Sequence, residues 1–155
     1  MANTRFIMHH EERTHELDGS GEGLASACKV LLLDDEAEFA NMVKVFLETS
    51  GPYHVTVAGD GVQGIKQIMA MDFDIILCDM IMPNLAGDMF YRAVERTRPH
   101  LCKRFIFMTG HQGNAKINEF IRQVHGLIMW KPFELHTLIE AIQVIIKKNP
   151  PPANS

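Results

Sequence analysis

The chain has 155 residues, of which 46% are hydrophobic and 22% are charged, and its formal net charge is −4. This composition predicts one globular domain and gives no general electrostatic case for direct binding of nucleic acid. Three cysteines without paired spacing indicate neither a disulfide framework nor a zinc site, so a reducing, cytoplasmic setting fits best. We expect neither a signal peptide nor a membrane span, because no apolar run approaches the required length of about 18 residues.

Residues 1–27 differ in composition from the rest of the chain. The run DGSGEG at 18–23 is typical of a flexible linker. In the HEERTH segment at 10–15, the second histidine comes one residue too late for the zinc-protease motif. We therefore predict a flexible N-terminal extension or linker over 1–27, a folded domain over 28–148 and a C-terminal tail over 149–155.

From residue 29 onward, short apolar runs alternate with segments of helical periodicity. Buried strands are predicted at 29–33, 75–79, 105–108 and 126–130, and an edge strand at 53–58. Helices are predicted after each strand, the second one capped by Asp60 and the third one ending near Arg98. Five strands that alternate with five helices predict an α/β fold, a five-stranded doubly wound parallel sheet with helices on both faces.

Polar side chains stand at the C-terminal ends of the buried strands, and they are Asp34 with Asp35, Asp79, Thr109 and Lys131. Because the carboxyl ends of parallel strands share one edge, we expect these groups to meet in a shallow pocket. Three close carboxylates favour a hard divalent cation, with Mg²⁺ the best candidate. An ammonium and a hydroxyl suit phosphate oxygens. The combination predicts a phosphoryl group carried on an aspartate.

Four motifs together resemble the receiver domain of two-component response regulators. They are LDDE at 33–36, CDMIMP at 78–83 with Gly87, MTG at 108–110 and KPF at 131–133. The resemblance covers about residues 29–148. It implies a flavodoxin-like (βα)5 fold with strand order 2-1-3-4-5.

The resemblance also implies roles for the residues at the strand ends. Asp79 resembles the phosphate acceptor, Thr109 the switch hydroxyl and Lys131 the lysine that contacts the phosphate. The ligands of Mg²⁺ would be the carboxylates of Asp34, Asp35 and Asp79 and the backbone carbonyl of Ile81. The bond between Lys131 and Pro132 is expected to be cis, as is common in the family.

The chain departs from the family pattern at one position of the switch. The family usually has Tyr or Phe three residues before the lysine, and this chain has Ile128. Trp130 lies on the same face of the strand, so we hypothesise that it takes over part of the switch role; the alternative is that it packs beneath the last helix. Ile81 and His111, each two residues after a site residue, are expected to tune the lifetime of the phosphoryl group.

The resemblance implies a Mg²⁺-dependent signalling domain that accepts phosphate from a histidine kinase or a histidine phosphotransfer protein and then controls a downstream protein. Such a domain catalyses its own phosphorylation and dephosphorylation without being a conventional turnover enzyme. An unphosphorylated binding module on the same fold is the alternative. A phosphatase is disfavoured because Ile81 stands where a general acid is usual. A homodimer, and a receiver that belongs to a larger hybrid protein, are both left open.

Overall fold

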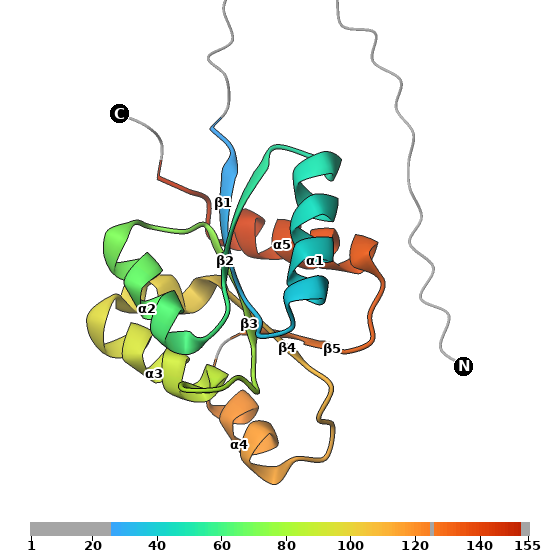
Figure 1. Cartoon of the computed structure of the whole chain (residues 1–155). Helices are drawn as coiled ribbons and strands as arrows, with labels where there is room; N and C mark the ends of the chain where they lie inside the picture. The colour runs from blue at the N-terminus through green and yellow to red at the C-terminus, as the bar shows by residue number, and fades with distance from the viewer. Residues whose placement is uncertain (1–25, 125, 153–155) are drawn as a thin grey trace, which may run out of the picture.

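The computed structural model describes residues 26–124 and 126–152, and in them five strands alternate with helices along the chain (Figure 1). The strands are β1 (Cys28–Leu33), β2 (Tyr53–Ala58), β3 (Ile75–Asp79), β4 (Phe105–Thr109) and β5 (Leu127–Trp130). All neighbouring strands are parallel, and their order in the sheet is β2-β1-β3-β4-β5. The predicted fold class and strand order are therefore confirmed.

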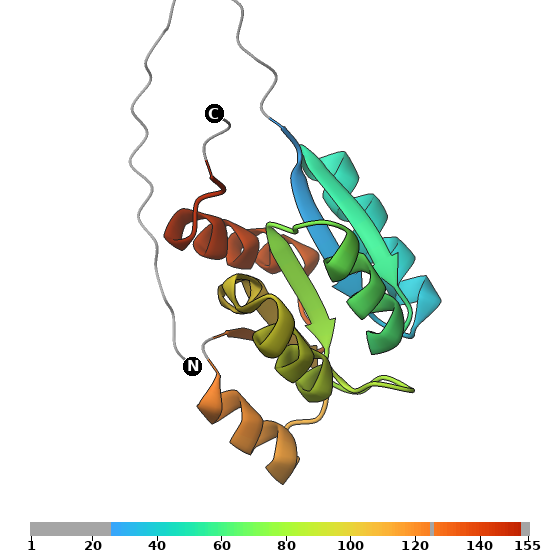
Figure 2. The same cartoon turned by 90° about the vertical axis from the view of Figure 1, so that its left-hand side faces the viewer.

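The helices cover both faces of the sheet (Figures 1 and 2). One face carries α1 (Ala37–Ser50) and α5 (Leu135–Lys148). The other carries α2 (Gly61–Ala70), α3 (Gly87–Thr97) and α4 (Ala115–Gln123). A 3₁₀ helix, η1 (Pro99–Arg104), follows α3 and was not predicted, because six residues at three per turn leave no 3.6-residue periodicity to detect.

Side-chain caps fix the start of two helices. The Asp60 carboxylate accepts a hydrogen bond from the backbone N–H of Gln63 at 2.8 Å, which confirms the predicted cap of α2. Asn114 caps α4 in the same way, accepting from the N–H groups of Lys116 at 3.1 Å and Ile117 at 3.2 Å. The caps satisfy backbone donors that the first turn of each helix leaves free.

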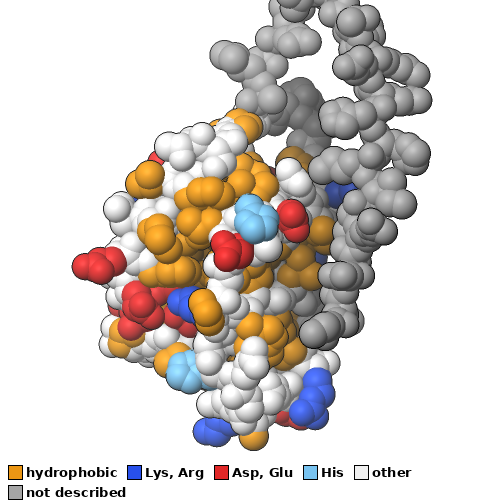
Figure 3. Space-filling model, turned by 90° about the vertical axis from the view of Figure 1, so that its right-hand side faces the viewer, with side chains coloured by type: hydrophobic (Ala, Val, Ile, Leu, Met, Phe, Trp, Pro, Cys, Tyr) orange, Lys and Arg blue, Asp and Glu red, His pale blue; other side chains and the backbone are white. Residues whose placement is uncertain are grey.

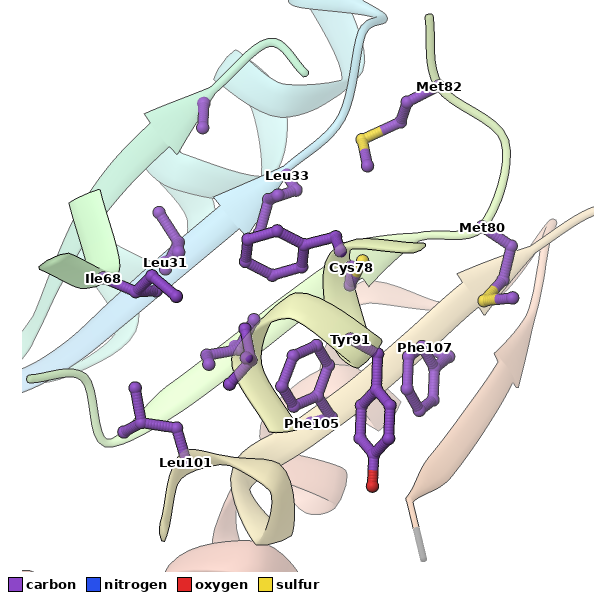
Figure 4. Packing of buried hydrophobic residues seen from close by; sticks show 14 of the residues in the cluster. Leu31, Leu33, Ile68, Cys78, Met80, Met82, Tyr91, Leu101, Phe105 and Phe107 are labelled. Atoms are coloured by element: carbon purple, nitrogen blue, oxygen red, sulfur yellow. The ribbon is translucent and has the colours of Figure 1, made fainter. Parts of the chain in front are cut away.

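The hydrophobic core consists of two layers, one on each face of the sheet. Along β1, Leu31 and Leu33 face the α2–α3–α4 layer, while Val30 and Leu32 face the α1–α5 layer. Figure 4 shows the first layer, where Cys78 of β3 lies among leucine and phenylalanine side chains. Burial raises the pKa of the Cys78 thiol well above its ordinary value, as suits a core residue.

This two-sided burial fixes the strand register, because a slip of one residue would exchange the two layers. The register pairs Leu33 of β1 with Cys78 of β3, so the next residues, Asp34 and Asp79, stand side by side at the end of the sheet. Thr109 of β4 pairs with Trp130 of β5, which brings Lys131 to the same edge. Among the described residues, no helix is long and apolar enough to cross a bilayer.

Residues 1–25 of the predicted extension over 1–27 lie outside the described residues, as do His125 and residues 153–155 of the predicted tail. The domain boundaries at 27 and 149 remain predictions.

Candidate functional site

Lys131 joins two strand-end carboxylates across the carboxyl edge of the sheet. Its Nζ lies 2.8 Å from Asp34 Oδ2 and 3.3 Å from Asp79 Oδ2. Its backbone N–H donates to the carbonyl of Thr109 at 2.9 Å, which extends the β4–β5 pairing by one residue. The peptide bond between Lys131 and Pro132 is cis, as expected. The structure thus brings together the predicted acids and the predicted lysine.

The environment of the Lys131 ammonium also includes an aromatic ring. Nζ lies 4.2 Å from the centroid of the Phe39 ring on α1, a cation–π contact. Phe39 in turn meets Phe133 edge to face, with their centroids 6.1 Å apart. Burial lowers the pKa of Lys131, but the hydrogen bond to Asp34 and the charge of Asp79 outweigh it, so the pKa is raised and the side chain stays charged.

Asp79 is nearly buried, with 7% of its surface exposed. Burial raises the pKa of its carboxyl group, opposed by the hydrogen bond from the backbone N–H of Ile81 and by Lys131. The Ile81 N–H lies 3.1 Å from Oδ1, while Oδ2 faces the ammonium. Both oxygens are therefore held in fixed directions, one by the backbone and one by the lysine.

Gly87 allows the loop after β3 to fold back against the site. A Cβ at this position would lie 2.4 Å from the Asp79 carbonyl oxygen and 2.9 Å from the Cα of Met80. The Gly87 N–H donates to the Met80 carbonyl at 3.1 Å. Only glycine fits this close backbone approach, which explains why the Gly87 position belongs to the motif.

Three carboxylates meet at this edge. One oxygen each from Asp34, Asp35 and Asp79 lies within 4.8 Å of the other two. Asp34 is 1% exposed, and its Oδ1 accepts from the N–H of Glu36 at 2.9 Å, whereas Asp35 is exposed to solvent. An oxygen-only set with one open side fits a hard divalent cation that keeps some of its water.

Thr109 stands at the edge as predicted, but its hydroxyl contacts neither carboxylate in this structure. The side chain is fully buried, and Oγ1 accepts from the N–H of His111 at 3.2 Å. Because the oxygen is the acceptor there, the hydroxyl proton is available for another partner. His111 and Ile81 are both exposed, on the loops after β4 and β3.

Ile128 packs against the α2–α3–α4 layer of the core. Leu127 and Met129 pack against the layer that contains α5, so strand alternation places Trp130 on the Ile128 side rather than beneath α5. On this side, the rings of Phe107 and Phe120 meet edge to face at 5.3 Å. Their contact links β4 to α4, and the sequence alone gave no sign of it.

The comparisons with known proteins agree with this geometry. A sequence profile of the response regulator receiver domain matches residues 30–143. The chain belongs to this family. Receiver domains act in two-component signalling and generally bind Mg²⁺ through an acidic pocket, which the clustered carboxylates at this edge match.

Two relatives match this receiver over nearly their whole length. It is 29% identical to a probable chemotaxis protein CheY of Rhizobium etli, over 79% of this chain and 95% of that protein. It is 30% identical to the solved chemotaxis protein CheY4 of Vibrio cholerae, with a TM-score of 0.68 over 78% of this chain and 99% of that one. In contrast, it matches only 13% of the sensor kinase CckA of Brucella abortus, at 27% identity over 81% of this chain.

We predict that Asp79→Asn raises the free energy of unfolding at neutral pH in the absence of divalent ions. Because the folded-state pKa of Asp79 is raised, its contribution to stability is complete below the unfolded pKa, near 4, and is lost as pH rises through the folded value. The difference in free energy of unfolding between Asp79→Asn and the wild type should therefore grow as pH rises from the unfolded pKa to the folded pKa of Asp79. Above the folded pKa it should stay constant. Urea denaturation at a series of pH values measures it.

We predict that Lys131→Met has the opposite effect on stability to Asp79→Asn. It should lower the free energy of unfolding by roughly 3 kcal/mol at neutral pH, because two buried carboxylates lose their cation. An Asp79→Asn variant that is less stable than the wild type at neutral pH would contradict this account of the site.

Proposed function

We propose that this receiver accepts a phosphoryl group on Asp79 from the phosphohistidine of a histidine kinase or histidine phosphotransfer protein, and thereby controls a protein partner. The observation that carries the proposal is the Lys131 ammonium, held between Asp34 and Asp79 at the open edge of the sheet. A cation fixed beside a nearly buried carboxylate suits the phosphoryl oxygens that would arrive there.

The proposed transfer is a displacement at phosphorus. An Asp79 carboxylate oxygen forms the new P–O bond while the P–N bond of the phosphohistidine breaks. The imidazole nitrogen keeps the electron pair and takes up a proton. Lys131 would then contact a phosphoryl oxygen, and the Ile81 N–H would continue to orient the carboxyl group. The chain's own residues position the groups and neutralise their charge.

Asp34, Asp35, Asp79 and the backbone carbonyl of Ile81 would hold Mg²⁺, in keeping with the three clustered carboxylate oxygens. When bound, the ion would offset the charge of the carboxylates and the phosphoryl oxygens. In this proposal Asp34 has two roles, because its Oδ2 also anchors Lys131.

The lifetime of the aspartyl phosphate would depend on Ile81 and His111. Ile81 is exposed beside Asp79 and offers a hydrolytic water no polar partner, which favours a long lifetime. His111 is exposed on the loop after β4, where it would orient that water or shield the phosphate.

We propose that the conformational switch begins at Thr109. Its hydroxyl would turn to donate to a phosphoryl oxygen. The β4–α4 loop would then move toward the site, because the His111 N–H of this loop is hydrogen-bonded to Oγ1. Ile128 has no ring to rotate, so Trp130, the strand partner of Thr109, would carry part of the response. Such a response is a shift between two populated conformations.

The partner surface for the kinase would include the face formed by α1 and α5. Met42 and Val45 of α1 and Val144 of α5 are exposed hydrophobic residues. Hydrophobic side chains extend over much of this face, with acidic side chains at its left edge and near its middle (Figure 3).

The free thiols of Cys28, Cys78 and Cys102 are consistent with the cytoplasmic location that the proposal requires.

The deciding experiment is intact-mass analysis after incubation with a small acyl-phosphate donor and Mg²⁺. We predict a gain of one phosphoryl group, with no gain in Asp79→Asn or after chelation of the metal, because the acceptor or its charge compensation is then missing. Asp88→Asn, a substitution at the start of α3 outside the carboxylate cluster, is the matched control and should leave the gain unchanged.

An absence of adduct with every donor would refute the proposal and favour an unphosphorylated binding module. Steady release of inorganic phosphate at enzyme-like rates would instead indicate a phosphatase.

Trp130 is the one tryptophan of the chain, so its fluorescence reports on the switch without interference. We predict that the emission changes on phosphorylation and that Asp79→Asn abolishes the change. Emission that stays constant while intact mass shows full phosphorylation would exclude Trp130 from the switch.

A further inference from the structure

A cavity of about 930 Å³ lies at the end of the sheet opposite Asp79. Its walls come from the start of β1, the residues before β3, η1 and the end of α5, represented by Cys28, Asp74, Leu101 and Ile146. Figure 1 shows the start of β1 and the end of α5 at the same end of the molecule, far from the C-terminal ends of the strands. The cavity is therefore separate from the phosphoryl-acceptor site.

Arg104 brings a buried positive charge to this cavity. It is 7% exposed, and its Nη1 donates to the carbonyls of Asp74 at 3.2 Å and Asn149 at 3.0 Å. Within residues 26–124 and 126–152, no carboxylate lies within ion-pair distance of it. Carbonyl dipoles solvate the guanidinium but do not neutralise it, and a buried charge normally has an ionic partner.

Nε and Nη2 of Arg104 make no hydrogen bond within the described residues. Both of its hydrogen bonds in the described part of the chain use Nη1. Yet no buried side-chain nitrogen or oxygen there lacks a partner, so Nε and Nη2 keep access to open space. Arg104 lines the cavity, so these two nitrogens are the donors that it can offer to a ligand there. A planar edge with two donors matches a carboxylate.

The Lys and Arg side chains of the lining outnumber its acids by one. Lys29 and Lys147 add to Arg104, while Asp72 and Asp74 oppose them. Asp72 pairs with Arg98 and contacts His100, whereas the Asp74 carboxylate accepts from the Lys29 backbone N–H at 2.9 Å and keeps its charge. An anion entering the cavity would therefore meet more positive than negative charge.

Much of the remaining wall is apolar, formed by a set of side chains from four elements or their flanks, namely Tyr53, Phe73, Leu101, Ile142 and Ile146. The volume is within the range of small-molecule sites, which combine an apolar lining with a few placed polar groups. A ligand for this cavity needs an apolar body with one negative end.

We propose that this cavity binds an amphipathic monocarboxylate, an aliphatic or aryl acid whose carboxylate pairs with Nε and Nη2 of Arg104 and whose apolar body packs on Leu101, Ile142 and Ile146. Such a ligand contacts both the first strand and the last helix. It gives the receiver a small-molecule input at the end of the sheet opposite Asp79. The inference holds whether or not Asp79 is phosphorylated.

The test is a titration of the full chain with octanoate, followed by ¹H–¹⁵N NMR. We expect a dissociation constant of about 0.1–1 mM and backbone shifts concentrated at Leu101, Arg104 and Ile146, with the signals of Asp79 and Lys131 unchanged. Octanamide and octylamine, which keep the apolar body but lack the negative charge, should bind at least about tenfold more weakly, because they cannot pair with the guanidinium.

Ile146→Trp fills the cavity without removing Arg104 or its carbonyl partners, and should weaken octanoate binding by about tenfold or more. Val144→Trp, on the same helix but exposed and outside the cavity, is the matched control and should leave binding unchanged. Thermal melting of both variants shows that each is folded.

Three results would overturn the proposal. They are octanamide binding as tight as that of octanoate, shifts that map outside the cavity, and the absence of shifts in the full chain at the highest soluble octanoate concentration.

Discussion

The ammonium group of Lys131 lies between the carboxylates of Asp34 and Asp79, and the arrangement of the whole carboxyl edge depends on this pairing. Both acids are nearly buried, and a third, Asp35, has an oxygen within 4.8 Å of theirs. Without a cation, such a cluster would repel itself and unfold the strand ends or take up protons. Lys131 lowers this repulsion enough for the site to form, while Asp35 stays open to solvent.

The two-layered core makes this pairing possible. Each central strand buries alternate residues on opposite faces, so its register and its end point are both fixed. Asp34 and Asp79 are neighbours because Leu33 and Cys78 are paired, and Lys131 reaches them because β5 is aligned on Thr109 and Trp130. The same core separates two ends of the sheet that differ in chemistry: an acidic edge that holds Lys131, and a cavity lined by Arg104, which pairs with no carboxylate of the described residues.

Much of the fold and of the site could be predicted because its signals are local. Apolar runs that end in Asp, Thr or Lys identify buried strands, and those ends must share an edge in a parallel sheet. What could not be predicted depends on tertiary contacts. Phe39 has an ordinary helical spacing, and only the folded chain places its ring against Lys131. The contact of Phe107 with Phe120 joins a strand and a helix whose patterns are each complete without it.

Two further features were not expected for related reasons. The sequence predicted that Thr109 joins the site. In the structure, its hydroxyl oxygen accepts a hydrogen bond from the backbone N–H of His111, because the loop after β4 places that group beside it. Arg104 precedes a strand, and no sequence pattern predicted that its side chain is buried. It is buried because the 3₁₀ helix and the end of α5 close over it, and neither contact has a local sequence signal.

The most direct test of the central claim is NMR observation of the Lys131 side-chain ammonium before and after phosphorylation in Mg²⁺. The account predicts a distinct, slowly exchanging signal in the free protein, because Nζ is held by Asp34 and Asp79, and a clear change in its chemical shift when a phosphoryl group arrives. The Asp79→Asn protein should show no change with the same donor. A Lys131 signal that is unaltered in protein shown by intact mass to be phosphorylated would contradict the account.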